Sequence, residues 1–303
     1  MGRGEHQFAR INPSIGATFR VADGLTLFAS YGESNRAPSA SELACADPDE
    51  PCRVPNAFLS DPPLEQVVSR SVEAGVRGRL GDARRPWLQA SLAAFGSRNQ
   101  DDILFIAGSR VGTGYFQNAG QTQRIGLELS LEIETGPVSF YAGYTLMRAT
   151  FEDELELPSP AHPSLEEDEE EGEEEGGALD VEPGSRIPGL PTHAVKAGLA
   201  VRPIPALEIG LSMVGQSGQP FRGDEANLLD DVGGFVVLGA HASYQLLPSL
   251  QLFVHANNLL DTEYHTFGVL GEPDEALPGT SDPRFYGVGA PFGVWAGATF
   301  THE

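Results

Sequence analysis

The chain has 303 residues, 40% of them hydrophobic and 20% charged, and a formal net charge of −24. A nucleic-acid binder needs basic surface to neutralise phosphates, so this charge argues against nucleic acid as a partner. No apolar run reaches the roughly 18 residues that a membrane-spanning helix needs. The length suffices for one large domain or two ordinary ones.

The negative charge is unevenly distributed along the chain, and the N-terminal residues have a recognisable composition. Residues 152–182 hold 15 acidic residues and no lysine or arginine, so most of the negative charge is a local feature. Residues 1–8 have no apolar segment after their basic residues, and this pattern is not that of a secretory signal peptide.

Apolar and polar residues alternate along eleven segments. The alternation predicts eleven β-strands, because successive side chains of a strand point to opposite faces. In residues 124–134, for example, Ile125 and Leu127 fall on one face and Arg124 and Glu128 on the other. In chain order the segments are 14–21, 25–31, 72–80, 88–95, 124–134, 138–146, 195–202, 207–213, 236–244, 250–257 and 292–300.

Short and long connections alternate between these strands. The short connections are rich in turn-forming Gly, Pro and Asp, and they are 22–24, 81–86, 135–137, 203–205 and 248–249. The long connections are about 34–66, 101–113, 154–190, 217–234 and 265–290. Outer-membrane barrels have short periplasmic turns and long extracellular loops, whereas a soluble β-sandwich has no such asymmetry. The pattern therefore favours an antiparallel transmembrane β-barrel over the sandwich.

Four motifs on these segments resemble those of TonB-dependent outer-membrane receptors. Residues 25–43 are similar to the family's "LYASYSEGFRAPS…EL" stretch, and residues 257–264 to its near-terminal "NLFDxxY" stretch. Pro283 and Arg284 look like the "PR…G" before the last strand, and Phe300 like the terminal aromatic residue. The residues that carry the first two matches are Arg36, Ala37, Pro38, Asn258, Leu259, Asp261 and Tyr264.

The resemblance implies a 22-strand barrel that encloses a plug domain, in the outer membrane of a Gram-negative bacterium. Such receptors import scarce ligands, most often ferric siderophores or similar metal chelates, and TonB supplies the energy through the plug. Outer-membrane lipid, lipopolysaccharide and the barrel-assembly machinery are the other expected partners, and no cofactor is expected.

The chain departs from this pattern, because it shows no plug, TonB box or signal peptide, and three residues follow Phe300. We therefore expect residues 1–303 to be the C-terminal half of a receptor barrel, with eleven of its 22 strands. Residues 154–190 are expected to form an acidic, disordered extracellular loop. A partner that completes the barrel is a question that the sequence leaves open.

Four arginines in the expected outer loops are candidates for binding an anionic chelate, because guanidinium groups suit carboxylates and oxyanions. They are Arg36, Arg53, Arg110 and Arg222, and a solvated surface role is the alternative for each. Cys45 and Cys52 are expected to form a disulfide that connects two parts of the first long loop, with two unpaired thiols or a pair of metal ligands as the alternatives. His241 and His255 fall on the polar faces of successive strands, where they could meet.

Several aromatic residues near the expected membrane boundaries are candidates for interfacial girdles. They are Tyr31, Trp87, Phe140, Tyr144, Tyr264 and Trp295, and loop packing is an equal alternative for Tyr264.

No enzyme motif is present, neither G-x-S-x-G, H-E-x-x-H nor a P-loop, so we expect no catalytic activity. Residues 166–175 hold nine acids in ten positions, a pattern typical of a solvated loop. Diffuse cation capture by this run supports an alternative function, a self-sufficient, cation-dependent, β-rich surface binding or adhesion protein. The Arg-Gly-Asp tripeptide at 222–224 is interpreted as a chance occurrence.

Overall fold

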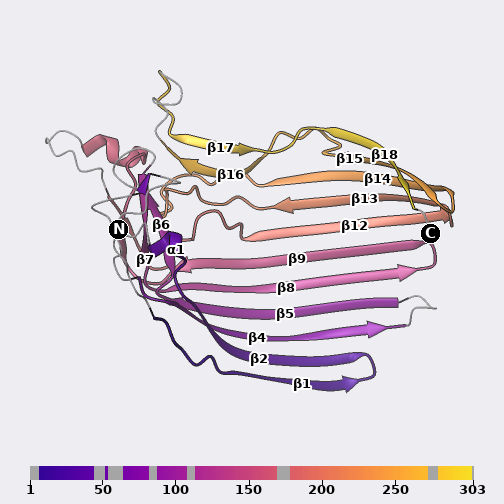
Figure 1. The fold of residues 1–303 in the computed structure, drawn as a ribbon, viewed down its shortest axis with the longest axis horizontal. Coiled ribbons are helices and arrows are strands. Elements are labelled where there is room, and N and C mark those ends of the chain that lie inside the picture. Colours follow the sequence, from indigo (N-terminus) through magenta and orange to yellow (C-terminus); the bar gives the residue numbers. More distant parts are fainter. Residues whose placement is uncertain are drawn as a thin grey trace.

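The computed structural model describes residues 7–43, 52–53, 64–81, 87–107, 113–168, 178–271 and 279–301. One 11-stranded antiparallel sheet dominates it, with the strands in chain order (Figure 1). They are β1 (Ser14–Ala22), β2 (Leu25–Arg36), β4 (Val67–Leu80), β5 (Trp87–Gln100), β8 (Thr122–Thr135), β9 (Val138–Phe151), β12 (His193–Ile204), β13 (Leu207–Gln216), β14 (Phe235–Leu247), β15 (Leu250–Asn257) and β18 (Gly293–Phe300). The predicted all-β fold and its eleven strands are confirmed.

The register keeps one kind of side chain on each face of the sheet. One row of cross-strand partners, here part of the apolar face, is Phe19, Leu27, Val76, Leu92, Leu129, Tyr144 and Val195. The apolar face is open rather than packed, since Phe19 is 67% and Leu211 56% exposed. A water-soluble sandwich would cover such a face, whereas lipid solvates it directly.

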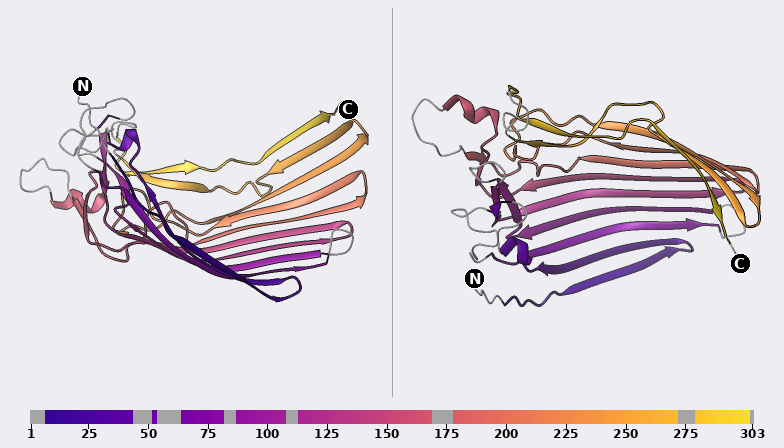
Figure 2. Two further views of the ribbon diagram at one scale, coloured as in Figure 1. Left: turned by 60° about the horizontal axis from the view of Figure 1, so that its bottom comes forward. Right: turned by 45° about the horizontal axis from the view of Figure 1, so that its top comes forward.

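The sheet is curved and has two edges, β1 and β18 (Figure 2). The short turns lie at one end of the strands and the long connections at the other (Figure 1). Gly24 and Gly136 adopt positive φ angles of 79° and 58° in two of the short turns, a conformation that favours glycine. The predicted alternation of short and long connections is therefore reproduced in space.

The long connections form small structures of their own. They comprise α1 (Ala40–Leu43), β3 (Cys52–Arg53), β6 (Ile103–Ala107), β7 (Thr113–Asn118), β10 (Leu155–Pro158), the 3-10 helix η1 (Pro163–Asp168), β11 (Ala178–Val181), β16 (His265–Leu270) and β17 (Arg284–Val288). These strands form three sheets, β3-β7-β6, β10-β11 and β16-β17. Among the described residues no helix is long and apolar enough to cross a membrane.

The expectation that residues 154–190 form one disordered loop is wrong for its described parts. β10 pairs with β11 in a regular antiparallel register. Leu157 and Val181 on these strands are each only 1% exposed, because they pack against Phe151. Burial of these apolar residues stabilises the ends of the connection, while residues 169–177, most of the acidic run, lie outside the described residues.

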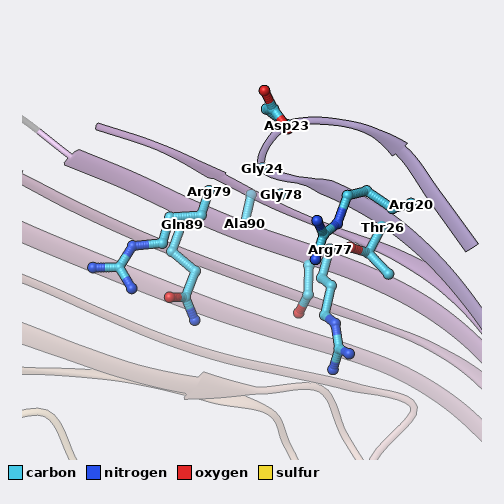
Figure 3. Close-up of a pocket in the computed structure, with 10 residues that line it drawn as sticks. Arg20, Asp23, Gly24, Thr26, Arg77, Gly78, Arg79, Gln89 and Ala90 are labelled. Carbon is cyan, nitrogen blue, oxygen red and sulfur yellow. The ribbon is translucent and has the colours of Figure 1, made fainter. Parts of the chain in front are cut away.

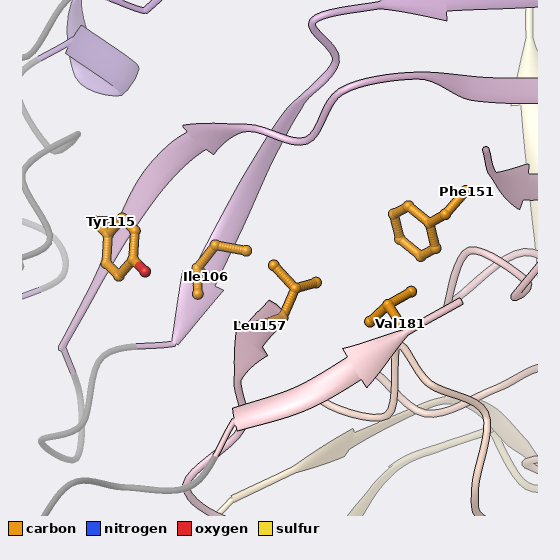
Figure 4. Packing of buried hydrophobic residues seen from close by; sticks show 5 residues of the cluster. All are labelled: Ile106, Tyr115, Phe151, Leu157 and Val181. Atoms are coloured by element: carbon orange, nitrogen blue, oxygen red, sulfur yellow. The ribbon is translucent and has the colours of Figure 1, made fainter. Parts of the chain in front are cut away.

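The clusters of buried apolar residues lie among the long connections, and only Phe151, at the end of β9, belongs to the 11-stranded sheet. The first contains Ile106, Tyr115, Phe151, Leu157 and Val181 (Figure 4). The second contains Phe221, Val232 and Leu270. Each buried aliphatic or aromatic side chain contributes about 1.5–3 kcal/mol relative to its exposed state. Connections far apart in the sequence are thereby packed together at one end of the sheet.

Candidate ligand-transport surface

The polar face of the sheet carries hydroxyl, amide and charged groups in register across neighbouring strands. One row of cross-strand partners is Arg20, Thr26, Arg77, Ser91, Ser130, Gly143 and Lys196. Ser91 and Ser130 share a hydrogen bond of 2.7 Å within that row. The polar residues therefore form a continuous surface on the side opposite the apolar face.

Three arginines cluster on this face near the short turns. Arg20, Arg77 and Arg79 line an open pocket of about 460 Å³, together with Thr26 and Gln89 (Figure 3). All three are exposed, and none forms an ion pair with another residue in the described part of the chain. This pocket brings together three arginines and one carboxylate, that of Asp23, and is therefore positively charged in a protein that is strongly acidic overall.

Aromatic rings hold two of these guanidinium groups in place. The Arg77 guanidinium lies 5.8 Å from the centre of the Phe28 ring. The Arg79 guanidinium lies 5.7 Å from the Trp87 ring, and the Trp87 indole donates a 2.7 Å hydrogen bond to Glu134. Such stacking restrains the arginine stem while leaving the charged nitrogens open to a ligand.

The predicted aromatic girdle is wrong for both tryptophans. Trp87 pairs with Glu134 and Trp295 pairs with His255, so both side chains belong to the polar face. Tyr264 packs in a loop, with its ring 4.5 Å from that of Phe235. The sequence places these residues near strand ends, but the strand register decides the face.

Aromatic rings on the polar face also cover glycines of neighbouring strands. A Cβ added at Gly75 would stand only 2.6 Å from the Phe28 ring, and a Cβ at Gly126 would stand at the same distance from the Phe95 ring. Tyr141 covers Gly198, and Phe253 covers Gly297 at 2.5 Å. Aromatic rings that occupy the space above glycines pack across neighbouring strands and help to fix the register.

His241 and His255 meet on the polar face, as their strand positions suggest. They are direct cross-strand partners, and their rings stack with centres 5.8 Å apart. The His241 Nε2 atom lies 3.5 Å from a carboxylate oxygen of Glu208. Among the described residues no three potential ligands surround a single metal position.

The four arginines predicted to bind ligand are not brought together as one group. Arg36 ends β2 and forms a 2.7 Å ion pair with Glu42. Arg222 is exposed, and its backbone pairs with Val269 beside β16. The backbone of Arg53 pairs with Thr113 of β7, and Arg110 lies outside the described residues. Ligand binding by these arginines stays a prediction.

The predicted disulfide falls largely outside what the structure describes. Cys45 lies outside the described residues, and Cys52 is placed only as part of strand β3. The pairing of Cys45 with Cys52 therefore stays a prediction.

The first motif builds the corner where β2 leaves the sheet. Ser39 Oγ accepts a 3.2 Å hydrogen bond from the backbone N–H of Glu42, and Glu42 accepts a 2.6 Å bond from that of Ser39. This reciprocal capping box satisfies two backbone donors at the start of α1. Although burial raises the pKa of Glu42, hydrogen bonds from Arg36 and Ser39 lower it overall. Ala37 is exposed and Pro38 buried between them.

The second motif is a turn after β15 that is held by the buried side chain of Asn258. The Asn258 side-chain amide donates to the carbonyl oxygens of Thr262 (2.9 Å) and Ala290 (3.0 Å), and its oxygen accepts from the Thr262 N–H at 2.9 Å. Asp261 accepts a 2.8 Å bond from the backbone N–H of Phe292, while the Leu259 N–H bonds to the Leu238 carbonyl. The motif therefore ties the last long connection to both of its strands.

The remaining motif residues lie near the C-terminal edge. Arg284 forms two 2.8 Å hydrogen bonds with the carboxylate of Asp282 at the start of β17. The Pro283 carbonyl accepts from the Gly271 N–H across the β16-β17 hairpin. Phe300 ends β18 as the partner of Leu250, with its side chain 68% exposed on the apolar face.

A buried histidine and aspartate join two long connections, and the sequence analysis did not identify this pair. His162 and Asp224 are both 0% exposed, with Nε2 and Oδ1 3.3 Å apart. The Ser164 N–H donates to the His162 Nδ1 atom, so Nε2 carries the proton and donates to Asp224. Asp224 also accepts from the N–H groups of Leu228 and Leu229. A fully buried Asp224 makes the Arg-Gly-Asp tripeptide unavailable for adhesion.

A polar network at the end of β5 predicts a pH effect. Burial raises the pKa of Asp102, but hydrogen bonds from Thr122 and Asn99 and the Arg124 charge lower it overall. A lowered folded-state pKa gives stability that is fully present above the unfolded value of ~3.9 and is lost as pH falls from that value through the lower folded-state pKa. We expect Asp102→Asn to cost about 1–2 kcal/mol at pH 7 and much less at pH 3.

The free energy of urea unfolding in detergent at both pH values measures this effect. The exposed Asp230 provides the matched control, since Asp230→Asn should change neither value. An Asp102→Asn protein that is destabilised equally at pH 7 and pH 3 would contradict the assigned role of the carboxylate charge.

Comparison with known proteins places this architecture in a family. The family model described as TonB dependent receptor-like, beta-barrel, matches residues 2–259. The siderophore receptor PiuA from Acinetobacter baumannii has 19% identity and a TM-score of 0.66, with 95% of this chain and 35% of PiuA covered.

Two further solved structures share the fold. For the ferric-catecholate import receptor Fiu from K12 E. coli the identity is 18% and the TM-score 0.62, with 95% of this chain and 34% of Fiu covered. For the copper transporter OprC the identity is 19% and the TM-score 0.65, with 95% of this chain and 38% of OprC covered. The chain thus spans little more than a third of the length of these proteins. On the match over residues 2–259, the chain belongs to the TonB-dependent receptor β-barrel family.

Proposed function

We propose that the chain is part of an outer-membrane active-transport receptor of a Gram-negative bacterium. Its ligand would be a ferric siderophore or a similar metal chelate, and TonB would supply the energy through a plug domain. The observation that carries this proposal is the sheet itself, with an exposed apolar face for lipid and a polar face that holds the Arg20, Arg77 and Arg79 pocket. We propose transport and no enzymatic reaction.

Both edges of the sheet favour the proposal that residues 1–303 form half of a barrel. Unpaired backbone groups in lipid cost several kcal/mol each, so the edges must be paired there. β1 and β18 both run toward the short turns, because the sheet has 11 antiparallel strands. A second sheet that completes the barrel would pair antiparallel with both β1 and β18. Its first and last strands would therefore both run away from the short turns, which requires an odd number of strands.

Exposed arginines at both ends of the polar face support an anionic ligand. Arg222 is exposed among the long connections, where a chelate would first bind. The arginine pocket lies at the opposite end of the polar face, where a released ligand would leave. PiuA and Fiu are described as siderophore and ferric-catecholate receptors, which supports the same ligand class.

Uptake of radiolabelled ferric iron as a tris-catecholate complex tests the proposal. Cells that lack the gene should lose uptake, cells that regain it should recover, and a protonophore should abolish the recovered uptake. Arg222→Gln should raise the half-saturation concentration about tenfold, the value of one charge-assisted hydrogen bond. The matched control is Arg284→Gln, because Arg284 is already paired with Asp282. Uptake that is unaffected by the deletion, or by the protonophore, would contradict the proposal for this ligand.

A further inference from the structure

A row of arginines stands on the apolar side of the sheet, just beyond its apolar residues. Arg70 lies two residues before Val72 on β4, and Arg98 lies two residues after Gly96 on β5, so each arginine is on the same face of the sheet as its neighbour. Both arginines are nearer the long connections. Two residues correspond to about 7 Å along a strand. Val72 is 54% and Ile125 46% exposed, so the arginines follow directly on the surface that would contact lipid.

Arg70 and Arg98 face each other directly across neighbouring strands. They are cross-strand partners in the β4-β5 register, and their side chains are 43% and 52% exposed. Like charges in directly opposed positions destabilise a sheet unless another charge compensates them. An anion that lies close to both guanidinium groups would therefore stabilise the pair.

The carboxylates nearby compensate this pair incompletely. Glu33 lies 3.6 Å from Arg70, but it also accepts hydrogen bonds from Arg10 and from the Tyr31 hydroxyl. Glu152 lies 3.7 Å from Arg98, too far for a hydrogen bond. Most of the donor groups of Arg98 are thus open to solvent.

A third arginine on the same side of the sheet lies on β9, in the neighbouring row that contains Gly96 and Ile125. Arg148 is exposed and is the cross-strand partner of Ile125, so it shares the outward side. It forms no ion pair within the described residues. It lies two strands from Arg98 and two residues nearer the short turns, so the two positions are about 12 Å apart.

We propose that Arg70, Arg98 and Arg148 bind the phosphorylated headgroup of an anionic lipid in the outer leaflet. Guanidinium groups bind phosphate oxygens in pairs, and opposed arginines at headgroup depth provide such a fork. The arginines directly adjoin the exposed apolar surface, so we infer that the phosphate belongs to a lipid. The acyl chains of that lipid would cover Val72 and Ile125. This inference rests on the outer-membrane placement proposed above and adds a specific lipid site to it.

Native mass spectrometry of the full chain in a zwitterionic detergent tests the proposal. The probes are diphosphoryl lipid A, phosphatidylcholine and inorganic phosphate. The protein should retain lipid A in preference to phosphatidylcholine. The variant Arg70→Gln/Arg98→Gln should bind lipid A about thirtyfold more weakly, because each arginine contributes about fivefold near an anionic headgroup.

The control Arg202→Gln/Arg284→Gln removes the same charge from two arginines that are paired with Glu208 and Asp282. It should leave lipid A binding within about twofold of the unaltered protein. The variant Arg70→Lys/Arg98→Lys keeps the charge and should retain most of the binding. If the glutamine variant does not fold, two measurements on the unaltered protein test the site. It should prefer lipid A to phosphatidylcholine, and high salt should abolish this preference.

Three outcomes would overturn the lipid site. They are equal retention of both lipids, undiminished binding by the glutamine variant, and competition by free phosphate as strong as that by lipid A. The last result would mean an anion site without lipid selectivity. A protein that needs no detergent and binds neither lipid would instead contradict the membrane placement itself, so the two failures are distinguishable.

Discussion

Replacement of Asn258 by alanine is expected to lower the free energy of unfolding by about 3 kcal/mol. Asn258 is 1% exposed, and its amide is the partner of the Thr262 N–H and of two carbonyl oxygens. The alanine variant would leave these three partly buried backbone groups without their side-chain partner, and an unsatisfied buried polar group costs about 1–3 kcal/mol. The turn that connects β15 to the β16-β17 hairpin would lose its main constraint.

Urea unfolding of the protein in detergent, followed by its heat-modifiable mobility on gels, measures this loss. Leu260→Ala is the matched control, because Leu260 lies in the same turn and is 70% exposed. Asn258→Asp should be at least as destabilising as alanine, since a carboxylate would face the two carbonyl oxygens. An Asn258→Ala protein as stable as the control would show that the turn does not depend on this amide.

The second large effect is expected from Gly75→Ala on the polar face. A Cβ at Gly75 would stand 2.5 Å from the Leu92 carbonyl oxygen, 2.6 Å from Phe28 and 2.9 Å from the Ala93 Cα. The ring can move, but the two backbone atoms belong to the β4-β5 ladder and cannot. We expect a loss of about 3 kcal/mol, at the upper end of the range for overpacking.

Gly143→Ala provides the control for this glycine. Gly143 also lies on the polar face, but nothing stands within 4 Å of the position that its Cβ would take. It should therefore fold with little change in the urea midpoint. The double variant Gly75→Ala/Phe28→Ala should recover only part of the loss, because the clash with Leu92 persists. Equal stability of the two single alanine variants would refute the close approach at Gly75.

The sheet could be predicted from the sequence because its strands follow a strict period of two. The strand ends were less accurate, since the structure extends β2 to Arg36 and begins β4 at Val67. Those extensions consist mostly of polar residues on both faces, which carry no alternation. The loop hairpins were missed because β10 and β11 have four residues each and are separated by the acidic run.

The site could be predicted only in part, for physical reasons that differ among its residues. Alternation placed Arg77 on the polar face, but the pocket with Arg20 and Arg79 depends on the register of β1, β2 and β4. His162 and Asp224 are 62 positions apart and carry no local pattern that would pair them. The residues of the first two family motifs, by contrast, hold a corner and a turn in place through local hydrogen bonds.

Cysteine labelling at two neighbouring positions of β8 tests most directly whether the two faces meet lipid and water. Leu127→Cys and Glu128→Cys, in a background with Cys45 and Cys52 replaced by serine, are treated with a polar maleimide in isolated outer membranes. Leu127 lies on the apolar face and Glu128 on the polar face. We expect rapid labelling of the Glu128→Cys protein and protection of the Leu127→Cys protein. Equal, rapid labelling at both positions would mean that both faces are in water, and the membrane barrel would be contradicted.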